Sequence, residues 1–108
     1  MTTNTQDQVD PTIGALDLCM GIDPGMSGGI SLLDLSGRVV AAEKMPPTER
    51  DTVDLIESNL HRIRFCVLEK VGAMPKQGVS STWKFAQHYG FLRGVLVALR
   101  VPFDEVRP

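Results

Sequence analysis

Two acidic residues each follow a short apolar run in this 108-residue sequence. Asp23 comes directly after residues 18–22. Glu69 comes directly after residues 65–68. Open α/β sheets bind ligands outside the carboxyl ends of their strands, so two neighbouring strands of this kind would bring the carboxylates together. Carboxylates that close repel each other unless a cation lies between them.

The chemistry that fits such a pair is binding of a divalent metal ion next to a phosphate. Mg²⁺ binds through one or two carboxylates together with waters and phosphate oxygens. Two-metal hydrolysis of a phosphodiester places ions about 3.5–4 Å apart and recruits more carboxylates than these two. Asp23 and Glu69 therefore predict part of such a site. The competing interpretation is structural: Asp23 forms a turn with Pro24 and Gly25, and Glu69 is a solvated strand end.

The elements that must position these acids follow from the pattern of apolar residues. Strands are predicted where short apolar runs are bounded by turn formers, and helices where apolar residues recur at helical spacing, one of them after the N-cap candidate Thr48. Ser36 and Gly37 form a predicted two-residue hairpin connection. The predicted strands are 18–22, 29–35, 38–43, 65–68 and 101–106, and the predicted helices are 49–62 and 80–99.

The order β-β-β-α-β-α-β predicts an α/β fold, with a mixed sheet that begins as an antiparallel meander and helices packed on it. The fully apolar strands 18–22 and 65–68 are expected to be central and covered on both faces. Side chains alternate along a strand, and Cys19 is four residues from Asp23 whereas Cys66 is three from Glu69. If the acids converge, the two cysteines lie on opposite faces as core residues and form no disulfide.

Length and composition favour one domain, because 43% apolar content is enough for one ordinary core. Residues 1–16 are polar and are predicted to be a flexible tail, with the domain spanning 17–108. No apolar stretch approaches the roughly 20 residues of a membrane helix. We therefore expect a soluble, intracellular protein with no membrane partner.

The formal net charge is -2, but the charge is unevenly distributed. Residues 1–69 hold 11 acids and 5 bases, whereas 70–103 hold no acid and five bases. These bases, which could form a basic face for a phosphate backbone or an ordinary solvated helix face, are Lys70, Lys76, Lys84, Arg93 and Arg100.

The motif GIDPG at 21–25, followed by VLE at 67–69, resembles the first two motifs of RuvC-type Holliday-junction resolvases, members of the RNase H-like nuclease superfamily. The segment MPKQGVSS at 74–81, leading into a helix with Gly90 and Gly94, is similar to the phage-type and prophage-type branch. The resemblance extends from about Leu18 to the last residue.

The resemblance implies a crossover-junction endodeoxyribonuclease of DNA recombination and repair, cytoplasmic and dependent on Mg²⁺, with Mn²⁺ as a substitute. Asp23 and Glu69 are then catalytic metal ligands. Branched DNA is the expected partner, with a homodimer in which Gly90 and Gly94 permit close helix packing. The loop 71–81 is expected to border the junction, and the expected DNA contacts are Lys76, Gln77, Gly78, Ser80, Ser81 and Lys84.

The sequence departs from the family pattern at its C-terminus. The family adds one or two acids from a helix after the fifth strand, so the chain is expected to be a C-terminally truncated domain that lacks this helix. Asp104 and Glu105 come too early to replace those acids. Two alternatives remain: a non-catalytic RNase H-like nucleic-acid-binding module, and a phosphotransferase that uses Asp23, Gly25 and Ser27 as a phosphate loop.

Four residues of the second helix have structural interpretations as well. The three aromatic residues are predicted to be core or interface residues rather than residues that stack on nucleic-acid bases; they are Trp83, Phe85 and Tyr89. His88 is predicted to be a surface histidine, with positioning of water or phosphate as the alternative.

Overall fold

The computed structural model describes residues 17–70 and 78–107, so the predicted tail at 1–16 and most of the predicted junction loop lie outside the described residues. The predicted element order is confirmed. The elements are β1 (Leu18–Asp23), β2 (Gly29–Asp34), β3 (Val39–Lys44), α1 (Glu49–Ser58), β4 (Ile63–Glu69), α2 (Val79–Ala98) and β5 (Phe103–Val106).

The five strands form one mixed sheet in the order β3-β2-β1-β4-β5. β1 pairs antiparallel with β2, which pairs antiparallel with β3, as the predicted meander requires. β4 lies parallel to β1 on its other side, and β5 lies parallel to β4. The prediction that β1 and β4 are central is therefore confirmed.

Local signals explain most of the boundaries. The Thr48 hydroxyl accepts a hydrogen bond from the Asp51 N–H at 3.0 Å and caps α1 as predicted. α1 ends at Ser58, four residues before the prediction, because Ile63 belongs to β4. Ile63 is apolar and follows Leu60 at helical spacing, so the sequence pattern fits a helix as well as a strand. In the structure it is buried in the core as the first residue of β4.

The β2–β3 hairpin differs from the predicted two-residue connection. The Asp34 N–H donates to the Arg38 carbonyl at 2.9 Å, which leaves three residues between the paired positions. The third, Gly37, has φ 92°, the left-handed conformation of a three-residue loop. The Asp34 carboxylate accepts hydrogen bonds from Ser36 and from the Arg38 N–H, and the Ser36 hydroxyl contributes most to lowering the pKa of Asp34.

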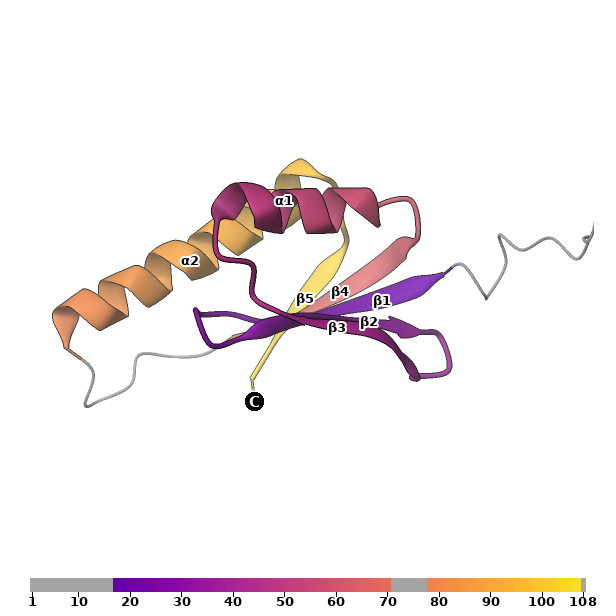
Figure 1. The fold of residues 1–108 in the computed structure, drawn as a ribbon, viewed down its shortest axis with the longest axis horizontal. Helices are drawn as coiled ribbons and strands as arrows, with labels where there is room; N and C mark the ends of the chain where they lie inside the picture. The colour runs from indigo at the N-terminus through magenta and orange to yellow at the C-terminus, as the bar shows by residue number, and fades with distance from the viewer. Residues whose placement is uncertain (1–16, 71–77, 108) are drawn as a thin grey trace, which may run out of the picture.

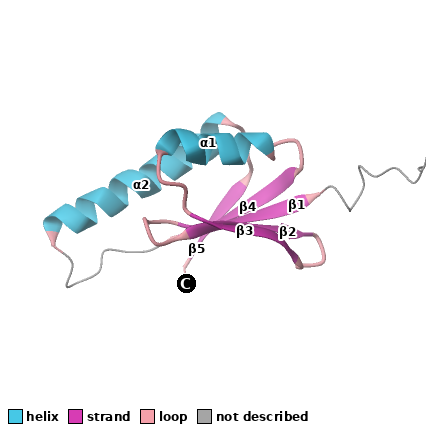
Figure 2. Ribbon diagram, in the orientation of Figure 1, coloured by secondary structure: helices cyan, strands magenta, loops and turns pink. Residues whose placement is uncertain are grey.

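Both helices lie on the same face of the sheet (Figure 2). The core is formed between this face and the helices, and it includes Leu18, Met20, Ile22, Ile30, Cys66 and Leu68 from the sheet and Ile56, Leu92 and Leu96 from the helices. Alternate residues of β1 and β4 on the opposite face, such as Gly21 and Val67, are only half-buried. In the described residues the prediction that β1 and β4 are covered on both faces is therefore wrong. We call the two sides the covered face and the uncovered face.

The two halves of α2 have different surroundings. Its buried residues, Leu92, Val95 and Leu96, all belong to the C-terminal half. The N-terminal half extends past the sheet (Figure 1), and Trp83 is 64% exposed there, so it is not a core residue. Within the described ranges, neither helix has the length and apolarity that a membrane crossing requires.

The cysteines lie as the alternation of side chains predicts. Met20 is the register partner of Cys66, and Phe65 is that of Cys19. Cys66 therefore points into the core and Cys19 to the uncovered face, and both are free thiols. Only Cys66 is fully buried, so the prediction of two core cysteines holds for one of them.

Candidate metal centre and nucleic-acid interface

The two predicted acids converge at one end of the sheet. Ile22 and Leu68 are register partners on the parallel strands β1 and β4, so Asp23 and Glu69 follow side by side. Their parity places both on the uncovered face, with Gly21 and Val67. Asp23 is exposed and Glu69 is half-buried. The structure thus brings together the two residues that the sequence analysis singled out for chemistry.

The Asp23 carboxyl group affects the protonation of Glu69. The pKa of Glu69 lies above its ordinary value of 4.5, first because of desolvation and then because of the Asp23 charge and a hydrogen bond between the two side chains. Two carboxylates in contact disfavour full ionisation of both. A cation between them would remove that penalty.

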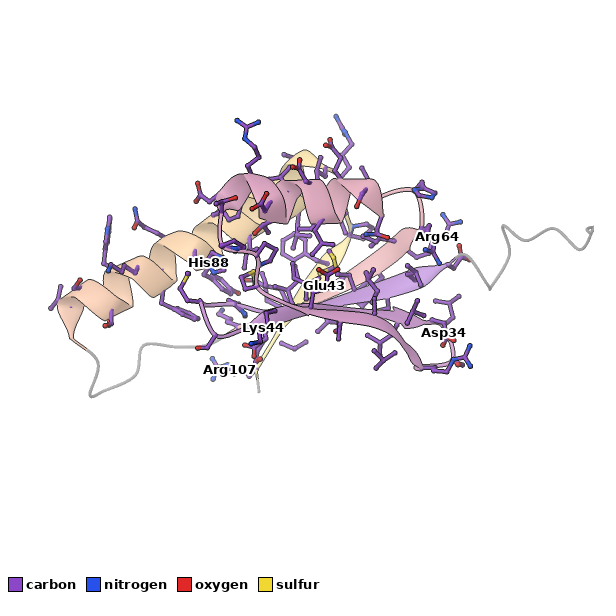
Figure 3. All side chains as sticks on the ribbon, viewed as in Figure 1. Asp34, Glu43, Lys44, Arg64, His88 and Arg107 are labelled. Carbon is purple, nitrogen blue, oxygen red and sulfur yellow. The ribbon has the colours of Figure 1, made fainter. Side chains whose placement is uncertain are left out.

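A hollow of about 430 Å³ opens on the uncovered face beside the acids. Gly21 forms part of its floor, and a Cβ at that position would approach the Ser31 hydroxyl to 2.9 Å. Arg107 lines the same hollow. Figure 3 shows Arg107 and Lys44 at this end of the sheet and Asp34 and Arg64 at the other end. The hollow therefore combines two acids, a hydroxyl and a guanidinium, a set suited to a divalent ion and a phosphate.

The turn after Asp23 depends on two glycines. Gly25 has φ 101°, a backbone conformation that side chains strongly disfavour. A Cβ on Gly28 would lie 1.8 Å from the carbonyl oxygen of Asp23, so only glycine fits there. The Gly28 N–H donates to the Gly25 carbonyl at 3.0 Å and closes the turn. The sequence motif thus produces a tight turn that directly follows the metal-ligand candidate.

His88 contacts this turn from α2. Its Nδ1 accepts a hydrogen bond from the Gly25 N–H at 3.0 Å. Burial lowers the pKa of His88, against the opposing influence of Glu49. The prediction of a surface histidine is therefore wrong: His88 is half-buried and bonded to a segment 63 positions away in the chain.

A second hollow, of about 550 Å³, lies between the β1–β2 turn, the start of α1 and the N-terminal half of α2. Ser81 and Lys84, two of the expected DNA contacts, line it together with Ser27 and Gln87. Gly78 is the N-cap of α2 and Ser80 lies in its first turn, both exposed, at a position that attracts anions. Lys76 and Gln77 lie outside the described residues.

The basic residues of the second half do not form one continuous face. The Nε of Arg93 is 3.3 Å from a carboxylate oxygen of Glu105, so the Arg93 charge is partly neutralised within the chain. Arg100 follows the C-terminus of α2, and Lys84 lies near its N-terminus. They are 16 positions apart in the sequence, and the helical part of that separation, from Lys84 to Ala98, alone spans about 21 Å. Lys84 is the member of this set that lines the second hollow.

The two acids of β5 lie on different faces. Glu105 is on the covered face, where it accepts a hydrogen bond from the Tyr89 hydroxyl and pairs with Arg93. Asp104 is on the uncovered face as the register partner of Val67, while Val106 is the partner of Glu69. In ranges 17–70 and 78–107, no group of three metal-ligating side chains is present. The donor set there suits one ion held by two carboxylates, water and phosphate.

The fold is similar to that of two solved RuvC structures. A structure described as RuvC of T. thermophilus in complex with a Holliday-junction substrate matches with a TM-score of 0.60 and 17% identity, covering 85% of this chain and 65% of that chain. A second Thermus thermophilus RuvC structure matches with a TM-score of 0.54 and 18% identity, covering 84% and 64%. This chain thus spans a little under two thirds of their length. The predicted RNase H-like α/β fold is confirmed.

Comparisons of sequence add no relative. No protein-family model matches the chain, and no curated protein matches it. The similarity to the RuvC structures therefore concerns the fold.

Two residues that line the hollow of the acids, Ser31 and Arg107, were not predicted from the sequence. Ser31 lies between Ile30 and Leu32 in β2, and strict alternation could have placed its hydroxyl on the face of the acids. Arg107 follows the strand that pairs with β4, which only the register reveals. The link from His88 to Gly25 joins segments whose packing no local pattern encodes.

Proposed function

We propose that this chain carries the catalytic metal site of a structure-selective endodeoxyribonuclease that cleaves phosphodiesters in branched DNA. The observation that carries the proposal is the convergence of Asp23 and Glu69 at the ends of the parallel strands β1 and β4. The RuvC-like fold supports it, because one of the matched RuvC structures holds a Holliday-junction substrate. The proposed setting is DNA recombination and repair.

In this proposal the two carboxylates are ligands of Mg²⁺, with Mn²⁺ as a substitute. Desolvation and then the Asp23 charge raise the pKa of Glu69, and the repulsion between the two carboxylates favours a bound ion. The bound ion supplies Lewis-acid polarisation of a phosphoryl oxygen. Ser31 and Arg107 contact the phosphate in the same hollow, and Gly21 leaves space for it because it has no side chain.

The second hollow is the proposed place for the DNA backbone beyond the cleaved phosphate. Lys84 offers a charged donor, and Ser81 offers a hydroxyl near the N-terminus of α2. Contacts of this kind position the nucleic acid without reading its sequence. The proposed DNA contacts also include two residues at the N-terminus of α2, Gly78 and Ser80. Two further proposed contacts, Lys76 and Gln77, precede this helix in the sequence.

Substitution of the acids tests the proposal. Asp23→Asn and Glu69→Gln keep the size of each side chain but remove its charge. Each should reduce Mg²⁺-dependent junction cleavage by at least about 10²-fold, while junction binding in a gel-shift assay without metal is preserved. Glu57→Gln, an exposed carboxylate of α1, is the matched control and should cleave normally. Unchanged cleavage by either site variant would exclude this function.

A homodimer through the exposed face of α2 is part of the proposal. Trp83, Gly90, Gly94 and Val97 are spaced to share one helix face, and all are exposed. A Cβ on Gly90 or Gly94 would meet nothing within 4 Å, so packing inside the described chain does not require either glycine. Glycine in a helix costs about 1 kcal/mol relative to alanine, which a close helix–helix contact could offset.

Sedimentation equilibrium tests the dimer. Gly94→Glu places a charged side chain in the proposed contact and should shift the chain to monomer. Ser58→Glu, at an exposed position of α1, is the control and should leave the dimer unchanged. A wild-type chain that is monomeric at all concentrations would contradict the dimer but not the metal site.

A non-catalytic nucleic-acid-binding module is the second candidate. The observation that favours it is the absence of a third metal ligand near the acid pair in the described part of the chain. Junction binding by wild type without cleavage in Mg²⁺ or Mn²⁺ would support this candidate over the nuclease.

A further inference from the structure

The hydrogen bond from Gly25 to His88 connects the turn after Asp23 to α2. Gly25 is two residues past Asp23 and has φ 101°, a conformation that a free glycine exchanges readily with others. The Nδ1 of His88 accepts the Gly25 N–H at 3.0 Å. This contact therefore restricts the backbone where it leaves the proposed metal ligand.

The histidine itself is held in place by its helix. The ring of Phe91 stacks on the His88 ring, with centroids 6.1 Å apart. The ring of Phe85 lies against Gly25, because an ideal Cβ on that glycine would be 3.5 Å from Cε1 of Phe85. One turn further along α2, Leu92 is completely buried in the core. The acceptor thus lies one helical turn before the part of α2 that is anchored in the core.

The protonation state agrees with this geometry. An Nδ1 that accepts a hydrogen bond carries no proton, so His88 is the neutral tautomer with its proton on Nε2. Burial favours the neutral form by lowering the pKa of His88. The charged groups that face it are Glu49 of α1 and Lys84 of α2, which line the same hollow.

We propose that His88 is a positioning residue, which fixes the turn at Gly25 and thereby the place of the Asp23 carboxylate relative to Glu69. The covered side of the sheet would in this way set the geometry of a site on the uncovered side. The inference rests on the proposed metal site. Groups behind metal ligands commonly change metal affinity by 10-fold or more when removed.

Two substitutions at His88 separate the acceptor from the ring. His88→Phe keeps an aromatic ring and removes the acceptor. His88→Asn keeps an acceptor, because its Oδ1 is as many bonds from the backbone as Nδ1 of histidine. His61→Asn, at an exposed histidine in the α1–β4 turn, is the matched control. His88→Leu serves as a second acceptor-free variant if the phenylalanine variant does not fold.

Two measurements on the full chain test the proposal. Amide hydrogen exchange of Gly25 reports the hydrogen bond, and Mn²⁺ titration, followed by paramagnetic broadening of amide signals near Asp23, reports metal affinity. His88→Phe should lose Gly25 protection and bind Mn²⁺ about 10-fold more weakly. His88→Asn should keep protection and bind within about 3-fold of wild type, as should the His61 control.

The outcomes distinguish failure of the positioning role of His88 from failure of the proposed metal site. Loss of Gly25 protection with unchanged Mn²⁺ affinity would overturn the positioning role alone, as would an asparagine variant as weak as the phenylalanine variant. If wild type and Asp23→Asn show the same lack of Mn²⁺ binding, the proposed metal site itself fails, and the positioning role fails with it.

Discussion

The covered and uncovered faces of the sheet are built from the same strands but hold different residues. On β1 and β4 the covered face holds Met20 and Leu68, at 1% and 0% exposure, whereas the uncovered face holds half-buried Gly21 and Val67 and ends in the two acids. The covered face provides apolar burial, the main stabilising term of folding. Charged groups can gather on the other face because the core does not depend on it.

The largest expected difference between the faces is in stability. Leu68→Ala should lower the free energy of unfolding by about 3 kcal/mol, because it leaves a cavity in a completely buried site. Val67→Ala, one residue away on the uncovered face, should cost about 1 kcal/mol or less. Urea unfolding followed by circular dichroism measures both. Equal losses would mean that the uncovered face is as well packed as the core.

The two thiols should react at very different rates. Burial, followed by the influence of Cys19, raises the pKa of the Cys66 thiol to about 12. The thiolate is the reactive form, so in the folded chain Cys66 should react with a disulfide reagent at least about 10-fold more slowly than half-buried Cys19. Cys19→Ser and Cys66→Ser assign the two phases. A fast reaction at Cys66 would show that the covered face opens readily.

Divalent metal should stabilise the uncovered face in a way that depends on the acids. At a Mg²⁺ concentration about ten times its dissociation constant, the thermal midpoint of wild type should rise by about 5 °C. Glu69→Gln should abolish the rise and also be more stable than wild type without metal, since it removes the repulsion from Asp23. A metal-dependent shift that persists in Glu69→Gln would place the ion elsewhere.

The pH dependence of stability should have opposite signs at Glu69 and Glu105. The folded-state pKa of Glu69 is raised, so its contribution is fully present below pH 4.5 and is lost as pH rises through the folded pKa. The pKa of Glu105 is lowered, chiefly by the Tyr89 hydrogen bond, so its contribution is present above pH 4.5 and is lost as pH falls through the folded pKa.

The smallest expected effect concerns the neighbouring acids of β5. Glu105→Ala should lower the thermal midpoint slightly, because it removes the contacts with Tyr89 and Arg93. Asp104→Ala on the uncovered face should stay within about 0.5 kcal/mol of wild type. Thermal melts at neutral pH and near pH 3 measure both. A larger loss for the Asp104 variant would mean that it has a structural role.

Much of the fold was predictable because its signals are local. Short apolar runs, the Thr48 cap and the glycines after Asp23 act within a few residues, and they led to the correct order of strands and helices. The errors in element boundaries occurred where two local patterns compete. Ile63 suits a helix and a strand equally, and Ser36 and Gly37 allow hairpin loops of two or three residues. Only the pairing of strands decides between such options.

The sequence by itself determined that Asp23 and Glu69 end two apolar strands and that Cys19 and Cys66 point to opposite faces, because strand alternation is a property of the backbone. Tertiary structure decided the rest. It placed both helices on one face, held Arg93 on Glu105, brought Arg107 into the hollow of the acids and joined His88 to Gly25. These contacts connect distant segments, and their geometry follows from packing and register, which no local pattern of residues encodes.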